Sequence, residues 1–517
     1  MRKFTRIPFG VAFMCAVVVF CAGATSGAAS QDSTLYSIAF TNPSGLPANV
    51  DQMVANAGGT IVDRIPEIGG IGVQSSNPNF LSAIQANSSV KAAGVAVTTS
   101  IPETDAVTAD GGSENNGGTY SPTGSDTQAM PDPLGYEQWD KKKMHATSTG
   151  SYAAQPGRKD VRVFVIDTGV DQSHIDIAAN LDTADSVSFV PTEPTIQDFN
   201  GHGTWTASAV GAPINGVGIS GVAPNITLVS GKVLNGAGSG EFLWTDEALV
   251  YAGLKHFDVV SASLGGYIPK CGSTTNPKGC DHPDYILLNR ATQFARSNGV
   301  LPVGALGNDG FDLADGNFMR DYVEAPGTIA GWVGVSATGY DDQKAFYSNY
   351  GDSAADVSAP GGSTRTYNGV PGGATCPHAS ICRLIGAWSS TGSSAPADPV
   401  EQCTGPGGTP PCFLYGYVQG TSMATPNAAG VAALIISQYG DFTSNNQNKP
   451  HMSPTAVEQI LQGSANNQPC PTPNTVTQGP GFPLPTATCK GNTGYNNFFG
   501  KGIVDAVNAI LYKNKAQ

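Results

Sequence analysis

The sequence predicts a doubly wound α/β domain with a mostly parallel sheet, preceded by a small α+β domain. Apolar, β-branched runs such as residues 161–167 alternate with helical stretches such as residues 242–256. Runs of this kind are typical of strands that are buried on both faces of a parallel sheet. A shorter alternation occupies residues 34–101, and a polar segment rich in Gly, Ser and Thr separates the two regions.

The composition fits a folded protein and disfavours nucleic-acid binding. The 517 residues leave room for one large domain and a smaller one. Hydrophobic residues make up 40% of the chain, charged residues 13%, and the net charge is −14. Because phosphate contacts need clustered Lys and Arg, we expect no nucleic-acid partner.

Residues 1–30 have the layout of a secretory signal peptide. Three basic residues precede an apolar run over residues 9–24, and small residues follow through Ser30. The run is short for a membrane span, which needs about 20 apolar residues. We therefore predict a secreted, extracellular protein with no membrane association after signal cleavage. An uncleaved membrane anchor is the alternative.

The cysteines agree with export. Two of the ten lie in the predicted signal peptide, and the other eight form four pairs of close neighbours in sequence. An even number of cysteines in an exported chain favours disulfides. Zinc binding is the alternative, although the chain has no C-x-x-C pair. Local pairing predicts the disulfides 271–280, 376–382, 403–412 and 470–489.

Residues 31–103 are predicted to form the small α+β domain. Strands are expected at 34–40, 60–65, 69–76 and 92–101, and helices at 49–58 and 80–90. The order βαββαβ is that of the ferredoxin-like arrangement. Residues 104–131 then lose almost all apolar content, which predicts a flexible linker. No Lys or Arg occurs in residues 103–128.

Residues 132–517 are predicted to form the large α/β domain. Its strands are expected at 161–167, 226–234, 257–264, 299–306 and 331–338, with helices at 242–256 and 285–298. In such a sheet, functional groups gather at the carboxyl ends of the strands and in the loops that follow.

Three polar residues occupy places that this fold uses for chemistry. Asp167 ends the run VRVFVID, while His202 and Ser422 each stand where a small-residue helix begins. The free N–H groups of a helix N-terminus stabilise the oxyanion formed when a serine attacks a carbonyl. Serine is a weak nucleophile, so it needs a histidine as base and an aspartate that fixes the imidazole tautomer.

The segments around these residues resemble the motifs of the subtilisin family over about residues 132–512. They read VIDTGVDQSHID, GHGTWTASAVGA and GTSMATPNAAGVAAL, in the order Asp, His, Ser. The resemblance implies a serine endopeptidase in which Asp167, His202 and Ser422 form the catalytic triad and Ser422 carries the acyl group. It implies no cofactor for the chemistry. A catalytically inactive relative that binds or scaffolds is the alternative.

Further segments extend the resemblance to substrate binding. VGALGNDG resembles the oxyanion motif and assigns that role to Asn308. Residues 236–241 resemble the edge that pairs with an extended substrate, and residues 261–266 resemble the strand that forms one wall of the pocket for the substrate residue before the scissile bond. These segments imply the substrate-binding residues Gly238, Ser239, Gly240, Ser263, Leu264 and Gly265. Their small and apolar side chains predict a preference for apolar or aromatic residues before the scissile bond.

The N-terminal domain resembles the inhibitory propeptide of the family. This resemblance implies a zymogen whose propeptide inhibits the enzyme intramolecularly, with a processing site in residues 104–131. An unrelated binding module is the alternative. The expected partners are protein or peptide substrates, and the expected state is a monomer.

The resemblance also implies a structural calcium site formed by Asp176 and Asn215, with backbone carbonyls nearby. Oxygen ligands of this kind suit Ca²⁺, although Asp176 is alternatively an ordinary surface carboxylate. The histidine motif departs from its commonest form at Trp205 and Ser208. We expect Trp205 to pack beneath the helix, and lining of the substrate cleft is the alternative.

Overall fold

The computed structural model describes residues 33–102, 129–270, 282–316, 319–364, 382–393, 396, 399–443, 450–477 and 486–513. The predicted signal peptide and most of the predicted linker therefore lie outside the described residues, as do the predicted pair 271–280 and one partner of the pair 376–382. In the part of the chain that is described, no helix combines the length and apolar character that crossing a membrane requires.

The described residues form a seven-stranded central sheet in the order β15-β14-β12-β10-β6-β8-β7. Every neighbouring pair in this sheet is parallel. The predicted doubly wound α/β fold is confirmed. The strands are β6 (Arg162–Asp167), β7 (Val187–Ser188), β8 (Thr227–Lys232), β10 (Val259–Ala262), β12 (Leu301–Ala305), β14 (Val333–Thr338) and β15 (Val357–Pro360).

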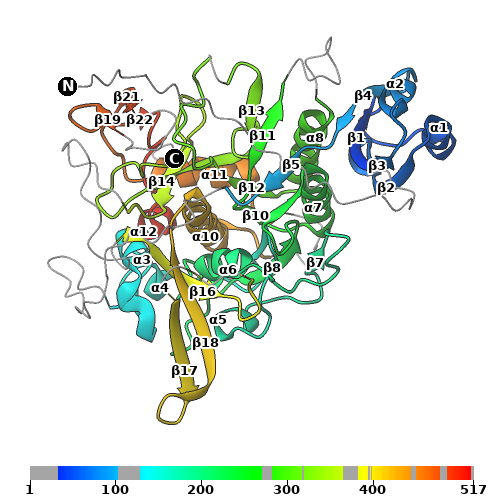
Figure 1. Cartoon of the computed structure of the whole chain (residues 1–517). Helices are drawn as coiled ribbons and strands as arrows, with labels where there is room; N and C mark the ends of the chain where they lie inside the picture. The colour runs from blue at the N-terminus through cyan, green and yellow to red at the C-terminus, as the bar shows by residue number, and fades with distance from the viewer. Residues whose placement is uncertain are drawn as a thin grey trace, which may run out of the picture.

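Helices cover both faces of this sheet, as Figure 1 shows. Strand β6 illustrates why, because its successive side chains point to opposite faces. Val163 and Val165 pack in the cluster that holds the apolar residues of α6 and α10. Phe164 and Ile166 pack in the cluster of α7 and α8. The helices are α6 (His202–Gly211), α7 (Phe242–Lys255), α8 (Pro283–Ser297), α10 (Thr421–Tyr439), α11 (Pro454–Ser464) and α12 (Ala506–Ile510).

The N-terminal domain is a four-stranded antiparallel sheet in the order β2-β3-β1-β4, with two helices. It lies at one side of the molecule against α7 and α8 (Figure 1). Its elements are β1 (Thr34–Phe40), α1 (Val50–Ala57), β2 (Thr60–Ile65), β3 (Gly70–Ser75), α2 (Phe80–Gln85) and β4 (Val90–Val95).

The last predicted strand of this domain, at residues 92–101, is in fact two strands. Strand β4 ends at Val95, and β5 (Thr98–Ser100) leaves the domain to pair with β9 (Ser239–Glu241) of the large domain. The predicted helix at 80–90 is shorter as well, because α2 ends at Gln85. The connection between the two domains therefore begins inside a segment that the sequence assigned to the small domain.

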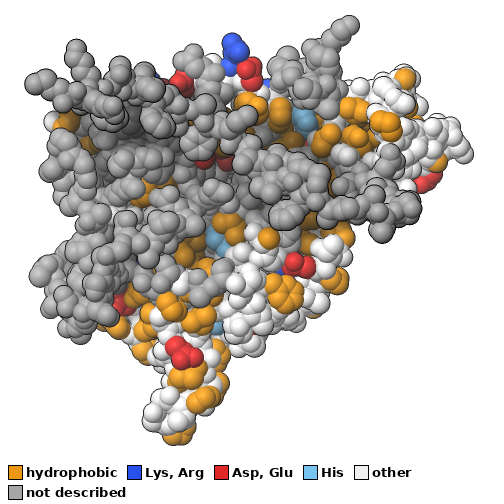
Figure 2. All heavy atoms as spheres, in the orientation of Figure 1, with side chains coloured by type: hydrophobic (Ala, Val, Ile, Leu, Met, Phe, Trp, Pro, Cys, Tyr) orange, Lys and Arg blue, Asp and Glu red, His pale blue; other side chains and the backbone are white. Residues whose placement is uncertain are grey.

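A three-stranded sheet formed by residues 384–418 carries a hairpin that projects from the large domain (Figure 1). Its strands are β16 (Leu384–Trp388), β17 (Pro399–Gly405) and β18 (Thr409–Val418). The disulfide Cys403–Cys412 joins β17 to β18, and Cys470–Cys489 lies near the C-terminus. Both predicted pairings are confirmed. Figure 2 shows hydrophobic and acidic side chains on the projecting hairpin.

Trp205 packs where helix α6 meets this three-stranded sheet. Its side chain is fully buried, and its indole nitrogen donates a hydrogen bond to the Gly416 carbonyl at 3.0 Å. A Cβ on Gly386 would lie 2.4 Å from the indole, so only glycine fits beside the ring. The predicted packing role of Trp205 is confirmed.

Candidate active site

Asp167 and His202 are in direct contact. Asp167 is the last residue of β6, and His202 is the first residue of α6. The His202 Nδ1 atom lies 2.8 and 3.0 Å from the two carboxylate oxygens of Asp167. The Thr168 backbone N–H and the Thr206 hydroxyl also donate to this carboxylate. The aspartate therefore fixes the imidazole so that Nε2 is the nitrogen available for proton transfer.

A glycine allows the chain to place His202 at this position. Gly201 has a φ of +119°, which side chains rarely adopt. A Cβ there would also lie 2.2 Å from the ring of Trp388. Asp198 fixes the same turn, because its carboxylate accepts hydrogen bonds from the backbone N–H groups of Gly201 and Thr204. The turn at Gly201 and the start of helix α6 together fix the position of the His202 imidazole.

Ser422 is the second residue of α10, and it is fully buried. Its hydroxyl donates a long hydrogen bond of 3.4 Å to the Ser263 carbonyl. His202 Nε2 is also buried, and it has no hydrogen-bond partner among the described residues. The two helices that carry these groups, α6 and α10, pack against each other. Catalytic hydrogen bonds are often long in the absence of substrate and shorten only in the reactive complex.

Asn308 follows β12 and is held by the residue before Ser422. Its side-chain oxygen accepts hydrogen bonds from the Thr421 N–H at 2.9 Å and the Thr421 hydroxyl at 2.8 Å. This arrangement leaves the Nδ2 group free to donate, and it lies 3.3 Å from the Pro102 carbonyl oxygen. The amide thus already contacts a peptide carbonyl, which is the task of an oxyanion donor.

The segment from Thr98 to Pro102 lies between the two predicted substrate-binding segments. Strand β5 pairs with β9, with Thr99 opposite Gly240 and Ser100 opposite Ser239. On its other edge, Ser100 exchanges two backbone hydrogen bonds with Gly265, at 3.0 and 2.9 Å. The N-terminal domain therefore supplies the middle strand of a three-stranded arrangement.

The remaining predicted substrate-binding residues continue this pattern. The Gly238 carbonyl accepts a hydrogen bond of 3.0 Å from the Ile101 N–H. Gly238 has a φ of +76°, and a Cβ on it would lie 2.6 Å from the Ile101 side chain. The Ser263 hydroxyl donates to the Ser422 carbonyl at 2.7 Å, and Leu264 is fully buried. Four of the six residues contact the bound segment, while Ser263 contacts Ser422.

Sequence reasoning missed Glu324, a buried acid on β13 (Tyr322–Ala325). The strand pairs with β11 (Gly266–Pro269), directly after the segment that contains Gly265. Burial, together with the nearby Asp309, raises the pKa of the Glu324 carboxyl well above its usual range. The segment YVEA matches none of the motifs quoted above, so only the fold brings this acid to the site.

The residues predicted to bind calcium do not fit a cation in their present arrangement. Both oxygens of Asp176 accept hydrogen bonds: from Asn215 Nδ2 at 3.0 Å, from the Ile219 N–H at 3.0 Å and from the Tyr415 hydroxyl at 2.8 Å. Burial raises the pKa of Asp176 to about 7. Calcium needs six to eight oxygen ligands, and N–H donors cannot coordinate it. The calcium site stays a prediction that this geometry does not favour.

Removal of calcium is therefore expected to change the melting temperature very little, because the Tyr415 hydroxyl of the projecting hairpin already donates a hydrogen bond to the Asp176 carboxylate. Thermal unfolding with EDTA and with millimolar CaCl₂ checks this expectation. A decrease of several degrees in EDTA, reversed by Ca²⁺, would restore the calcium site and require the hairpin to move.

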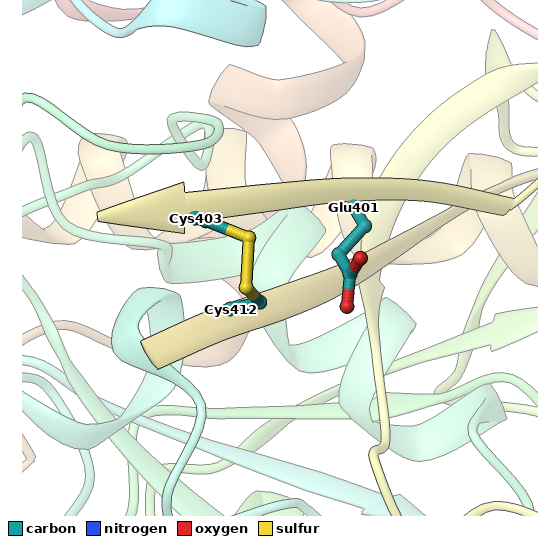
Figure 3. A group of neighbouring side chains, drawn as sticks. All are labelled: Glu401, Cys403 and Cys412. Atoms are coloured by element: carbon teal, nitrogen blue, oxygen red, sulfur yellow. A yellow bond between two sulfur atoms is a disulfide. The ribbon is translucent and has the colours of Figure 1, made fainter. Parts of the chain in front are cut away.

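Glu401, Cys403 and Cys412 lie close enough together for a metal ion (Figure 3). The two sulfur atoms, however, are bonded to each other in the disulfide. A disulfide offers no thiolate, and thiolates are the sulfur ligands of zinc. The disulfide therefore links the two strands of the hairpin.

The Asn308→Ala variant tests the oxyanion role. We expect kcat to fall by about 10²–10³-fold with little change in KM, because a donor to the oxyanion acts mainly in the transition state. Steady-state kinetics on a peptide substrate measure the effect. An equal rise in KM at constant kcat would show instead that Asn308 binds the ground state.

Comparison with known proteins agrees with this geometry. Residues 158–502 match the family described as the subtilase family. Subtilisin NAT of Bacillus subtilis subsp. natto is 32% identical over 327 residues, which are 63% of this chain and 66% of that protein. Subtilisin of Bacillus pumilus is 32% identical over 327 residues, or 91% of its length. The chain thus spans just under two thirds of the first relative.

A solved structure supports the same fold. It is a mutant of the epidermin leader peptide processing serine protease from Staphylococcus aureus, with a TM-score of 0.67 and 21% sequence identity. The match covers 94% of this chain and 100% of that chain. The likeness extends over the small domain as well as the large one. The match over residues 158–502 shows that this chain belongs to the subtilase family.

Proposed function

We propose that the protein is a secreted serine endopeptidase that hydrolyses peptide bonds through an acyl-enzyme intermediate. The observation that carries this proposal is the contact between Asn308 Nδ2 and the carbonyl of Pro102, at the end of an extended segment beside Ser422. The pair formed by Asp167 and His202 supplies the base that the serine needs.

The reaction follows from these positions. Ser422 Oγ attacks the substrate carbonyl while His202 Nε2 takes the hydroxyl proton, and Asp167 stabilises the imidazolium. The oxyanion receives hydrogen bonds from Asn308 Nδ2 and from the N–H of Ser422. His202 then protonates the leaving amine. A water molecule repeats the sequence and releases the acid.

We also propose that the N-terminal domain is an inhibitory propeptide and that the protein is made as a zymogen. Residues 98–102 pair with both segments predicted to bind substrate, and Pro102 contacts Asn308. A peptide substrate could therefore bind only after this segment leaves. The basic and apolar N-terminus supports export through a signal peptide.

Labelling with a fluorophosphonate tests the proposed function. The mature protein should react, and mass spectrometry should find the label on Ser422. A catalytically inactive relative with the same fold would stay unlabelled. A correctly folded mature protein that does not react would therefore contradict the endopeptidase proposal.

A further inference from the structure

We propose that Glu324 selects substrates with Lys or Arg immediately before the scissile bond. This inference rests on the proposed function and names the substrate class of the same site. It replaces the preference for apolar or aromatic residues that the sequence predicted. Four observations carry it: the direction of the bound strand, the position of the Glu324 carboxylate, the absence of a countercharge for it among the described residues, and the chemistry of Pro102.

The first observation is which face of the bound strand meets the enzyme. Ser100 lies directly opposite Gly265 in an antiparallel pair. Side chains of directly opposed residues lie on the same face of the ladder. Side chains also alternate along an extended strand, so residue 102 lies on the face of residue 100. A substrate residue in the place of Pro102 therefore points to the face on which Gly265 would carry a side chain.

The second observation is that the Glu324 carboxylate lies on that face. A Cβ built on Gly265 would be 3.1 Å from Glu324 Oε1. A Cβ built on Gly327 would be 3.2 Å from Glu324 Oε2. Both neighbours are glycines, so no side chain of theirs covers the carboxylate. A long side chain at position 102 extends toward this group.

The third observation is that this carboxylate is buried without a countercharge. Glu324 is 2% exposed, and its Oε2 atom has no hydrogen-bond partner among the described residues. No ion pair of Glu324 with a described cation is found. Asp309, beside Asn308, adds a second acid, whose carboxylate accepts a hydrogen bond from the Tyr267 hydroxyl at 2.5 Å.

A buried carboxylate without a countercharge is costly, and a cation with N–H donors offsets that cost. Lys and Arg are the substrate side chains that supply both. A Leu or Phe in the same place would leave the acid unpaired, and a Glu would add repulsion. A site discriminates between substrates more strongly when the wrong substrate leaves a buried polar group unpaired than when it merely lacks a methylene group.

The fourth observation is that the bound segment has no Lys or Arg in the place where a substrate residue precedes the scissile bond. Pro102 has neither a backbone N–H nor a charge, so it leaves Glu324 unpaired. The following residues, 103–128, contain no Lys or Arg. The N-terminal domain thus presents an uncharged residue where the enzyme selects a cation, which suits an inhibitor that must persist.

The test compares peptides that differ only in the residue before the scissile bond. For the mature enzyme, kcat/KM with Arg or Lys should exceed that with Leu by on the order of 10²-fold. The Glu324→Gln variant keeps the shape of the side chain and removes its charge. In this variant the ratio of kcat/KM with Arg or Lys to that with Leu should fall below about tenfold, while cleavage after Leu persists. Glu401→Gln on the exposed hairpin makes the same charge change far from the site and should leave the ratio unchanged.

The outcomes separate this inference from the proposed function. If the enzyme cleaves after Leu or Phe as readily as after Arg, or if Glu324→Gln keeps the full ratio, the inference is overturned and the endopeptidase stands. If Ser422 takes no label and no peptide is cleaved, the proposed function itself fails.

A variant of the full-length chain gives a second test, which holds even if Glu324→Gln does not fold. Pro102→Arg should convert the inhibitory segment into a substrate and speed self-cleavage between residues 102 and 103 at least tenfold over Pro102→Ala. N-terminal sequencing and a time course of processing measure the effect. Equal rates for the two variants would overturn the inference.

Discussion

The Ser422→Ala variant is expected to lose about 10⁶-fold in kcat on a peptide substrate, similar to the loss that this replacement causes in subtilisin. The nucleophile is absent, so neither the imidazole of His202 nor the carboxylate of Asp167 has a hydroxyl to activate. Asn308 and the strand-pairing segments remain, and they should preserve a small rate above that in water.

The fold of this variant should be intact. The hydrogen bond from the Ser263 hydroxyl goes to the backbone carbonyl of residue 422, which alanine keeps. Ser437→Ala is a matched control, because Ser437 is a buried serine on the same helix whose hydroxyl, among the described residues, bonds only to the Ala433 carbonyl. Its activity should stay close to that of the wild type. Retention of more than about 1% activity in Ser422→Ala would point to a different nucleophile.

The central sheet and the positions of Asp167, His202 and Ser422 at the ends of strands and helices could be predicted because their signals are local. The run VRVFVID is apolar throughout, as a strand between two helical layers must be, and it ends on Asp167. The motif residues beside His202 and Ser422 occupy helix starts, where small residues let the chain approach closely. Each of these features lies within a dozen residues of sequence.

The features that the sequence did not predict depend on contacts between distant residues. Strand β5 separates from β4 because its partners, β9 and Gly265, belong to the other domain. Glu324 reaches the site through the pairing of β13 with β11. Tyr415 reaches Asp176 from a hairpin more than 200 residues away in sequence. The types of the residues alone do not predict contacts between segments that are far apart in the sequence.

Once the proposed processing has separated the N-terminal domain, this domain should stay bound more tightly at acidic than at neutral pH, with a dissociation constant that rises about 10³-fold between pH 5 and pH 8. The reason is a set of buried and half-buried carboxyl groups at the contact between this domain and helices α7 and α8. Burial raises the pKa of Asp284 to about 7, and that of Glu241 to about 7 with a contribution from Asp284. Burial and Asp63 raise the pKa of Glu247 to about 8.

These groups contact the N-terminal domain directly. The Asp284 carboxylate accepts a hydrogen bond of 2.8 Å from the Val97 N–H. Glu241 lies opposite Thr98 in the pairing of β5 with β9. Asp63, on β2 of the small domain, is itself buried enough to have a raised pKa. Asp246, also with a raised pKa, is fully buried beside Asp284.

The sign of the effect follows from proton linkage. The bound state holds protons on these carboxyl groups that the separated domains release, so binding is favoured at low pH. The stabilisation is complete below the ordinary pKa values, near 4, and disappears as the pH rises through 7 to 8. His282 opposes this trend, because burial lowers its pKa to about 4 and release lets it gain a proton below about pH 6.5. The combined effect of several carboxyl groups on the binding free energy is larger than the opposing effect of His282.

Arg290 remains a constant part of the interface, since its guanidinium donates to the carbonyls of Ile68 and Phe40 at 3.0 and 2.9 Å and stays charged throughout. Inhibition of the mature enzyme by the cleaved domain, measured from pH 5 to pH 8 and corrected for the pH dependence of uninhibited activity, gives the dissociation constant. In the Asp284→Asn variant, the rise in the dissociation constant between pH 5 and pH 8 should be smaller by about tenfold or more. The Asp160→Asn variant, changed at an exposed position, should show the same rise as the wild type. Tighter inhibition at pH 8 than at pH 5 would mean that these carboxyl groups are ionised in the complex and that the charge of His282 governs release.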